Sequence, residues 1–128
     1  NAGVDIFAEN VANANTFSKS KFDITNRKKT AASVDWYIPE WEKEGNAGAA
    51  QRTPDISALV QEVVNRKDWS KGNAIAFMLL FNNHGDRDAL TYDGNPQKSP
   101  FLHIEVSNAQ KIILNGLIRD FKISHPDF

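Results

Sequence analysis

The stretch NHGDRDALTYDGNP, residues 83–96, contains the side chains of this sequence that are best suited to bind a metal ion. Carboxylate and amide oxygens are the ligands that Ca²⁺ prefers, and the stretch supplies Asp86, Asp88, Asp93 and Asn95. Their spacing does not match an EF-hand loop, and Arg87 adds a competing positive charge. Acidic residues, Asn and Gly also build turns between strands. The stretch is therefore predicted chiefly to form a hairpin turn, with a calcium site as the alternative.

Arg87 lies between Asp86 and Asp88 and is the candidate for holding a charged group. A guanidinium binds a carboxylate through two parallel hydrogen bonds. We therefore expect Arg87 to pair with a nearby carboxylate, such as Asp88 or Asp93, and to fix the geometry of the turn. Binding of an anionic ligand by Arg87 is the alternative.

The aromatic side chains suggest a second chemistry, because sugar rings stack on flat aromatic faces. Trp41 follows Pro39 in a Gly- and Ala-rich segment and is the best candidate for an exposed stacking residue, with Tyr37 as a second contact. Trp41 is chiefly expected to anchor its loop, and stacking on a ligand is the alternative. Trp36 and Trp69 flank predicted structured elements and are expected in the core.

Catalysis finds little support in the sequence. The chain has no cysteine, which excludes disulfides, zinc–thiolate sites and cysteine nucleophiles. It contains neither a G-x-S-x-G motif nor a metal-binding pattern of the H-E-x-x-H type formed by His84, His103 and His125. The chain is therefore predicted not to be an enzyme, and a fragment of an enzyme is the weakest alternative.

The length and the charge of the chain narrow the range of possible functions further. A chain of 128 residues has the length of one domain, and its formal net charge of −1 comes with basic residues that are scattered along the sequence. Scattered basic residues do not favour nucleic-acid binding. The longest apolar run, Ala74–Phe81, is too short to cross a bilayer. We therefore expect neither nucleic-acid binding nor membrane insertion.

Several short segments have the pattern of β-strands. Apolar and polar residues alternate in residues 4–10 and 31–38, and further strands are expected at 89–92 and 101–107. Residues 73–82 are apolar on both faces, which predicts a central strand that is covered on each side.

One segment has the pattern of an amphipathic helix. Thr53 is a natural N-cap, and Pro54 fits the first helical turn. Helical spacing then gives one apolar stripe: Ile56, Leu59, Val60, Val63 and Val64. The predicted fold class is therefore mainly β: an antiparallel β-sandwich, jelly-roll-like, with one amphipathic helix near residues 54–66.

Longer motifs resemble those of a known family. The segments ITNRKKTAASVDWYIPEW, AAQRTPDISALV, DWSKGNAIAFMLLF and GDRDALTYDGNPQKSPFLHIEV together resemble a β-sandwich module of bacterial secreted and cell-surface proteins, including proteins similar to pilus-tip adhesins. The resemblance spans about residues 6–106, and Asp86, Asp88 and Leu90 depart from the pattern. Its motif positions are Arg27, Thr30, Trp36, Gln51–Asp55, Trp69–Asn73 and Gly85–Gly94, with Pro100 and Leu102.

The tail carries a second resemblance. The segment LNGLIRDFKISHPDF is similar to the opening of a fibro-slime domain, at Gly116, Arg119–Phe121 and His125–Phe128. The expected organisation is the later part of a β-sandwich module in residues 1–107, followed by a linker and strand in residues 108–128 that begin a fibro-slime domain. An Asn115–Gly116 turn between apolar runs is also predicted there.

Together these features predict a non-catalytic structural or adhesive module of an extracellular bacterial surface protein. The resemblance implies that opening strands of the module precede Val4, so we expect an open sheet edge that a neighbouring domain or a strand-donating chain completes. The alternative is a carbohydrate-binding module for a polysaccharide or another surface ligand. In that case Trp41, Tyr37 and Arg87 would contact the ligand, with calcium held by the 86–95 loop and no other cofactor.

Overall fold

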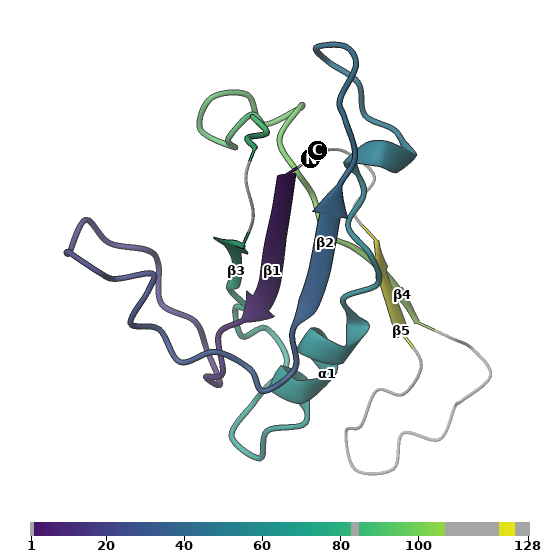
Figure 1. Cartoon of the computed structure of the whole chain (residues 1–128). Coiled ribbons are helices and arrows are strands. Elements are labelled where there is room, and N and C mark those ends of the chain that lie inside the picture. The colour runs from purple at the N-terminus through teal and green to yellow at the C-terminus, as the bar shows by residue number, and fades with distance from the viewer. Residues whose placement is uncertain (1, 83–84, 107–120, 125–128) are drawn as a thin grey trace.

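The fold is built around a small antiparallel β-sheet. The computed structural model describes residues 2–82, 85–106 and 121–124 (Figure 1). The main sheet has the strand order β2-β1-β3, and a second sheet contains two strands. The elements are β1 (Ala2–Ala8), β2 (Val34–Ile38), η1 (Ala49–Gln51), α1 (Ser57–Val64), β3 (Phe77–Phe81), β4 (His103–Val106) and β5 (Phe121–Ser124). This arrangement agrees with the mainly β class, with one α-helix.

The central strand of the main sheet is β1, and not the predicted strand at residues 73–82. β1 pairs with β2 on one side and with β3 on the other. No further strand pairs with β3 among the described residues, and the side chains of Leu79 and Phe81 are 43% and 62% exposed. The prediction was wrong because an apolar run can also form an edge strand that leaves some apolar side chains uncovered.

Helix α1 covers one face of the main sheet. Alternating residues of β1, among them Val4 and Ile6, point to this face and are buried. They form one core with Trp36 and Ile38 of β2 and with the apolar stripe of the helix, namely Leu59, Val60, Val63 and Val64. The stripe and the core position of Trp36 are as predicted.

The N-terminus of α1 differs from the prediction, because Thr53 is not its N-cap. The helix begins at Ser57, whose N–H donates a hydrogen bond of 2.8 Å to Oδ1 of Asp55. Thr53 does not cap the helix, and its hydroxyl oxygen is buried without a hydrogen-bond partner among the described residues. Asp55 lies closer to the first free N–H groups and can accept from them through a local Asx turn.

A long loop, residues 10–30, projects from the end of the sheet and is organised by Arg27 (Figure 1). The Arg27 side chain is only 8% exposed and lies 2.7 Å from Glu9 and 3.1 Å from Asp23. It also donates hydrogen bonds to the carbonyl oxygens of Asn15 and Thr16. Burial acts to lower the pKa of Arg27, but the hydrogen bonds and the charge attraction from Glu9 and Asp23 outweigh it and raise that pKa. Arg27 therefore stays charged and closes the loop.

Residues 85–102 form a long loop, and not the predicted hairpin. They contain no strand, so the strand expected at 89–92 is not formed. Instead the N–H groups of Gly94 and Asn95 donate to the carbonyl oxygen of Thr91 and build a turn. Gly and Asn in this stretch favour a turn as strongly as they favour a hairpin, so composition alone could not decide between them.

The tail contributes a strand to the second sheet. β4 and β5 pair antiparallel, with Ile104 opposite Ile123. The domain boundary predicted after residue 107 therefore falls between two paired strands. The turn predicted at Asn115–Gly116 lies outside the described residues.

Candidate functional site

Two loops lie at the end of the main sheet where β2 and β3 finish (Figure 1). Residues of both loops line an open pocket of about 860 Å³. One loop, residues 40–47, follows β2, and the other, residues 86–98, follows β3. Among the side chains that line the pocket are Trp41, Lys43, Asp86, Arg87, Asp88 and Leu90. The structure therefore brings together Trp41, Arg87 and two of the acidic residues that the sequence analysis singled out.

Arg87 joins the two loops. Its Nε donates a hydrogen bond of 3.0 Å to the carbonyl oxygen of Pro39, and its Nη1 donates one of 2.6 Å to the carbonyl oxygen of Asp86. Arg87 forms no ion pair with a carboxylate among the described residues, so the expected pairing with Asp88 or Asp93 is not found. Backbone carbonyl oxygens accept hydrogen bonds from two nitrogens of the Arg87 guanidinium. They do not neutralise its positive charge, which remains available to an anionic or hydroxyl-rich ligand.

Trp41 has two roles that the sequence analysis treated as alternatives. It packs against the core cluster, and its Nε1 donates a hydrogen bond of 3.1 Å to the carbonyl oxygen of Ala50. It also lines the pocket. Trp41 therefore anchors its loop and also contributes to the wall of the pocket.

Tyr37 lies away from the pocket. It is opposite Gly3 in the β1–β2 pairing, and the buried residues of β1 and β2 alternate with it, so Tyr37 is exposed on the sheet face that α1 does not cover. Of the two predicted aromatic residues, Trp41 lines the pocket and Tyr37 does not. The period of two along β2 contains the signal that separates Tyr37 from buried Trp36.

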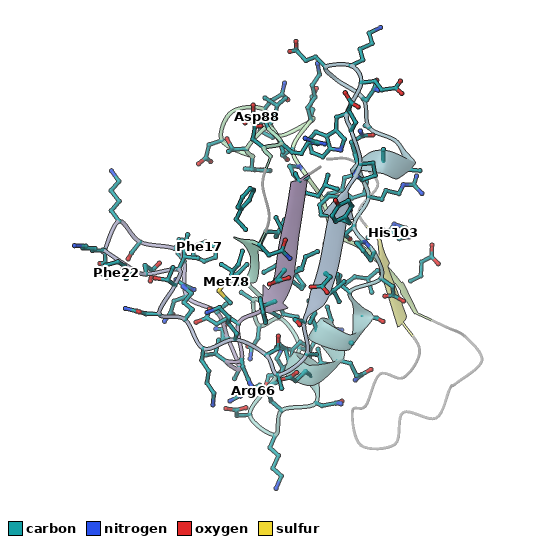
Figure 2. All side chains as sticks on the ribbon, viewed as in Figure 1. Phe17, Phe22, Arg66, Met78, Asp88 and His103 are labelled. Atoms are coloured by element: carbon teal, nitrogen blue, oxygen red, sulfur yellow. The ribbon has the colours of Figure 1, made fainter. Side chains whose placement is uncertain are left out.

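The predicted calcium ligands are divided between two places. Asp86 and Asp88 line the pocket (Figure 2 labels Asp88), whereas Asp93 and Asn95 belong to the turn at Thr91 and do not line it. No group of three or more acidic, His or Cys side chains among the described residues could hold a metal ion. His103 lies 3.0 Å from Glu105, and His84 and His125 are outside the described residues. Calcium binding stays a prediction.

Several lining residues escaped the sequence analysis, among them Lys43, Gln97 and Lys98. Lys43 shares a loop with Trp41, and Gln97 and Lys98 share a loop with Arg87. Single polar or charged residues in loops carry no sequence pattern that marks them. The contact between Arg87 and Pro39 spans 48 residues. Periodicity reports local structure, so it could not predict that these two loops meet.

A carboxyl pair lies on the sheet face opposite α1. Asp5 of β1 is directly opposite Asp35 of β2, and Asp5 also accepts a hydrogen bond from the side-chain amide of Asn82. A side-chain hydrogen bond with Asp5, together with the repulsion between the two carboxylates, raises the pKa of Asp35. The folded state therefore binds the Asp35 proton more tightly than the unfolded state does.

This pair predicts a pH-dependent stability. Binding of the Asp35 proton stabilises the folded state fully at acid pH, and this stabilisation is lost as pH rises through the raised pKa of Asp35. Near neutral pH the two negative charges therefore destabilise the fold. Asp35→Asn is expected to increase stability at neutral pH and to flatten this part of the pH profile, as measured by urea unfolding between pH 3 and about pH 8. Exposed Asp93→Asn is the control. Equal effects of the two substitutions would refute the assignment.

Comparisons with protein-family models, with curated proteins and with solved structures find no match to this chain. Among the described residues, no helix has the length and apolar character needed to cross a bilayer.

Proposed function

We propose that this chain is a non-catalytic adhesive module of an extracellular bacterial surface protein, and that it binds a polysaccharide in the pocket between residues 40–47 and 86–98. The observation that carries the proposal is the convergence of Trp41, Arg87 and Asp88 on one open pocket from loops far apart in sequence. The motif resemblance supports the extracellular setting and a β-sandwich architecture for the whole module.

The lining of the pocket matches the chemistry of a sugar. A sugar ring has an apolar face that packs against aromatic and aliphatic surface, which Trp41 and Leu90 supply. Its hydroxyl groups both donate and accept hydrogen bonds, which Asp88, Lys98 and Gln97 can satisfy. Positive and negative side chains both line the pocket, so a ligand rich in hydroxyl groups suits it better than a ligand of high charge.

Retention on immobilised polysaccharides tests this proposal. The full chain is passed over a panel of plant, marine and bacterial polysaccharides, with Ca²⁺ and with a chelator. We expect retention on at least one of them, and a loss of about tenfold in affinity in Trp41→Ala, since buried aromatic contacts carry much of the energy of such sites. Asp88→Asn is expected to weaken retention severalfold through the loss of a charged acceptor.

Two matched variants control for indirect effects. Tyr37→Ala removes an exposed aromatic side chain outside the pocket, and Asp93→Asn removes an acidic side chain from the same loop as Asp88 but outside the lining. Both are expected to keep full retention. Circular dichroism of Trp41→Ala shows whether its core contacts are needed for folding, and Asp88→Asn tests the pocket without touching the core. Lack of retention on the whole panel, or equal losses in the controls, would refute the carbohydrate ligand.

In the described part of the chain, no strand other than β1 pairs with β3. This open edge supports a second part of the proposal, namely pairing with a strand of a neighbouring domain or of another chain. Phe77, Leu79 and Phe81 alternate along β3, and β1 occupies only one side of the strand. An uncovered edge with exposed apolar side chains favours the addition of a strand. The β-sandwich would then be completed by strands from outside the described residues.

This edge predicts concentration-dependent self-association of the isolated chain. Leu79→Lys is expected to reduce association at least tenfold, because a charged side chain on an edge strand opposes pairing. Sedimentation velocity over a range of concentrations measures the effect. Leu90→Lys places the same charge on an exposed leucine of a loop and serves as the control. A chain that remains monomeric at all concentrations would argue against strand addition between copies.

A further inference from the structure

The 10–30 loop, a different surface from the pocket, concentrates the positive charge of the molecule. Residues 10–30 contain five of the 15 basic residues of the chain and only one of its 16 acidic residues. The other ten basic residues are scattered along the rest of the chain, so this loop is a local exception. Because Arg27 is paired with Glu9 and Asp23, the free positive charge comes from four lysines: Lys19, Lys21, Lys28 and Lys29.

Apolar side chains are exposed beside these lysines. Phe22 is 59% exposed and Ile24 is 48% exposed, and the ammonium group of Lys21 lies 4.9 Å from the centre of the Phe22 ring. Figure 2 shows Phe17 and Phe22 on the loop where it projects from the body of the sheet. The loop projects from the sheet (Figure 1), and its exposed apolar side chains suit a flat partner surface.

The backbone of the loop holds Phe22 in an unusual conformation. Phe22 has φ +65°, a value that bulky side chains rarely adopt. Its carbonyl oxygen accepts hydrogen bonds from the N–H of Asn26 (2.9 Å) and from the hydroxyl of Thr25 (3.3 Å), and the N–H of Ser18 donates to Asp23. The turn is thus well defined while its aromatic side chain stays in solvent. Such an outlier is a pointer to function.

We propose that the 10–30 loop docks the protein on an anionic lipid surface. Peripheral binding of this kind grows with the apolar area buried at the headgroup boundary and with the attraction of basic residues to anionic lipids. Phe22 and Ile24 supply the apolar area, and the lysines supply the charge. A hydrated polyanion would use the lysines but would gain little from aliphatic Ile24, so the combination favours the lipid surface.

Vesicle co-sedimentation of the full chain tests the proposal. Vesicles of phosphatidylcholine alone are compared with vesicles of equal parts phosphatidylcholine and phosphatidylglycerol, at low and at high salt. We expect binding to the anionic vesicles, weakened by salt. Lys19→Gln with Lys21→Gln is expected to weaken binding about 25-fold, or about fivefold for each lysine. Phe22→Asn is expected to weaken it about tenfold, since Asn tolerates the positive φ but removes the apolar ring.

Lys67→Gln with Lys71→Gln is the matched control, because it makes the same change in net charge on exposed lysines outside the loop. Retention of binding in this variant and loss in the loop variants would support the proposal. Absence of vesicle binding, equal binding to neutral vesicles, or equal losses in loop and control variants would overturn it. Loop-dependent retention on polygalacturonate, an acidic polysaccharide, without vesicle binding would overturn it as well. The loop and the pocket are separate surfaces, so either proposal can fail while the other stands.

Discussion

Leu59→Ala is expected to lower the free energy of unfolding by about 3 kcal/mol, a large share of the stability of a domain of this size. Leu59 is fully buried in α1, in the same core as Ile6 of the central strand and Val63 of the helix. Removal of the leucine side chain loses its transfer free energy and leaves a cavity that the surrounding side chains fill only partly. The better helix propensity of alanine offsets only a few tenths of a kcal/mol.

Urea unfolding followed by tryptophan fluorescence measures this effect, because Trp36 lies in the same core. An unchanged slope of the unfolding free energy against urea concentration would show that the substitution changes stability and not the surface exposed on unfolding. Leu90→Ala makes the same chemical change at an exposed site and is expected to shift stability by no more than about 0.5 kcal/mol. A Leu59→Ala variant as stable as the Leu90→Ala variant would show that α1 does not close the core of the sheet.

The sequence predicted those features of the fold that are encoded locally. The apolar stripe of α1 and the alternation in β1 and β2 give the helix, two strands and the buried side of each. The order of the strands in the sheet, in contrast, is not encoded by the local sequence. A run such as residues 77–81 satisfies the pattern of a central strand, but only the pairing of β1 with two partners shows that β3 lies at an edge.

The candidate site could be predicted only in part, for a similar reason. Residue type identified Trp41, Arg87 and Asp88 as chemically useful, and the structure places all three at one pocket. Residue type could not exclude Tyr37, because exposure and location at the pocket are independent properties. Nor could it show that the partners of Arg87 are backbone carbonyl groups, since every residue carries one and no sequence pattern marks it.

The second large effect on stability is expected at Glu62, whose carboxylate connects α1 to the end of the 10–30 loop by hydrogen bonds. Its Oε1 accepts hydrogen bonds from the N–H of Ala31 (2.8 Å) and from the side-chain amide of Asn10 (3.3 Å). Its Oε2 accepts one from the N–H of Ala32 (2.9 Å). One carboxylate therefore satisfies two backbone donors just before β2 and ties them to α1, a role that resembles the capping of a helix by an acidic side chain.

Glu62→Ala is expected to cost about 2 kcal/mol of stability, because hydrogen bonds to a charged acceptor are worth more than neutral ones and the two N–H groups lose their partner. Solvent reaches Ala31, which keeps the loss below that of a fully buried network. Glu62→Gln retains one acceptor oxygen and is expected to lose about half as much. Urea unfolding gives the free energies, and hydrogen exchange at the Ala31 and Ala32 amides should accelerate in both variants.

Gln61→Ala provides the control for this prediction, since Gln61 is the neighbouring helix residue and its side chain donates a hydrogen bond to Asn65, one turn further along the chain. Gln61→Ala is expected to lower the free energy of unfolding by no more than about 0.5 kcal/mol. If Glu62→Ala and Gln61→Ala had equal effects, or if the two amides kept their protection, the other contacts of the loop, among them those of Arg27 and Thr30, would be enough to hold it. Thr30 already accepts from the N–H of Ala8 and donates to the carbonyl oxygen of Ala32. A large effect at Glu62 would show that α1 also sets the position of the loop that we propose for lipid contact.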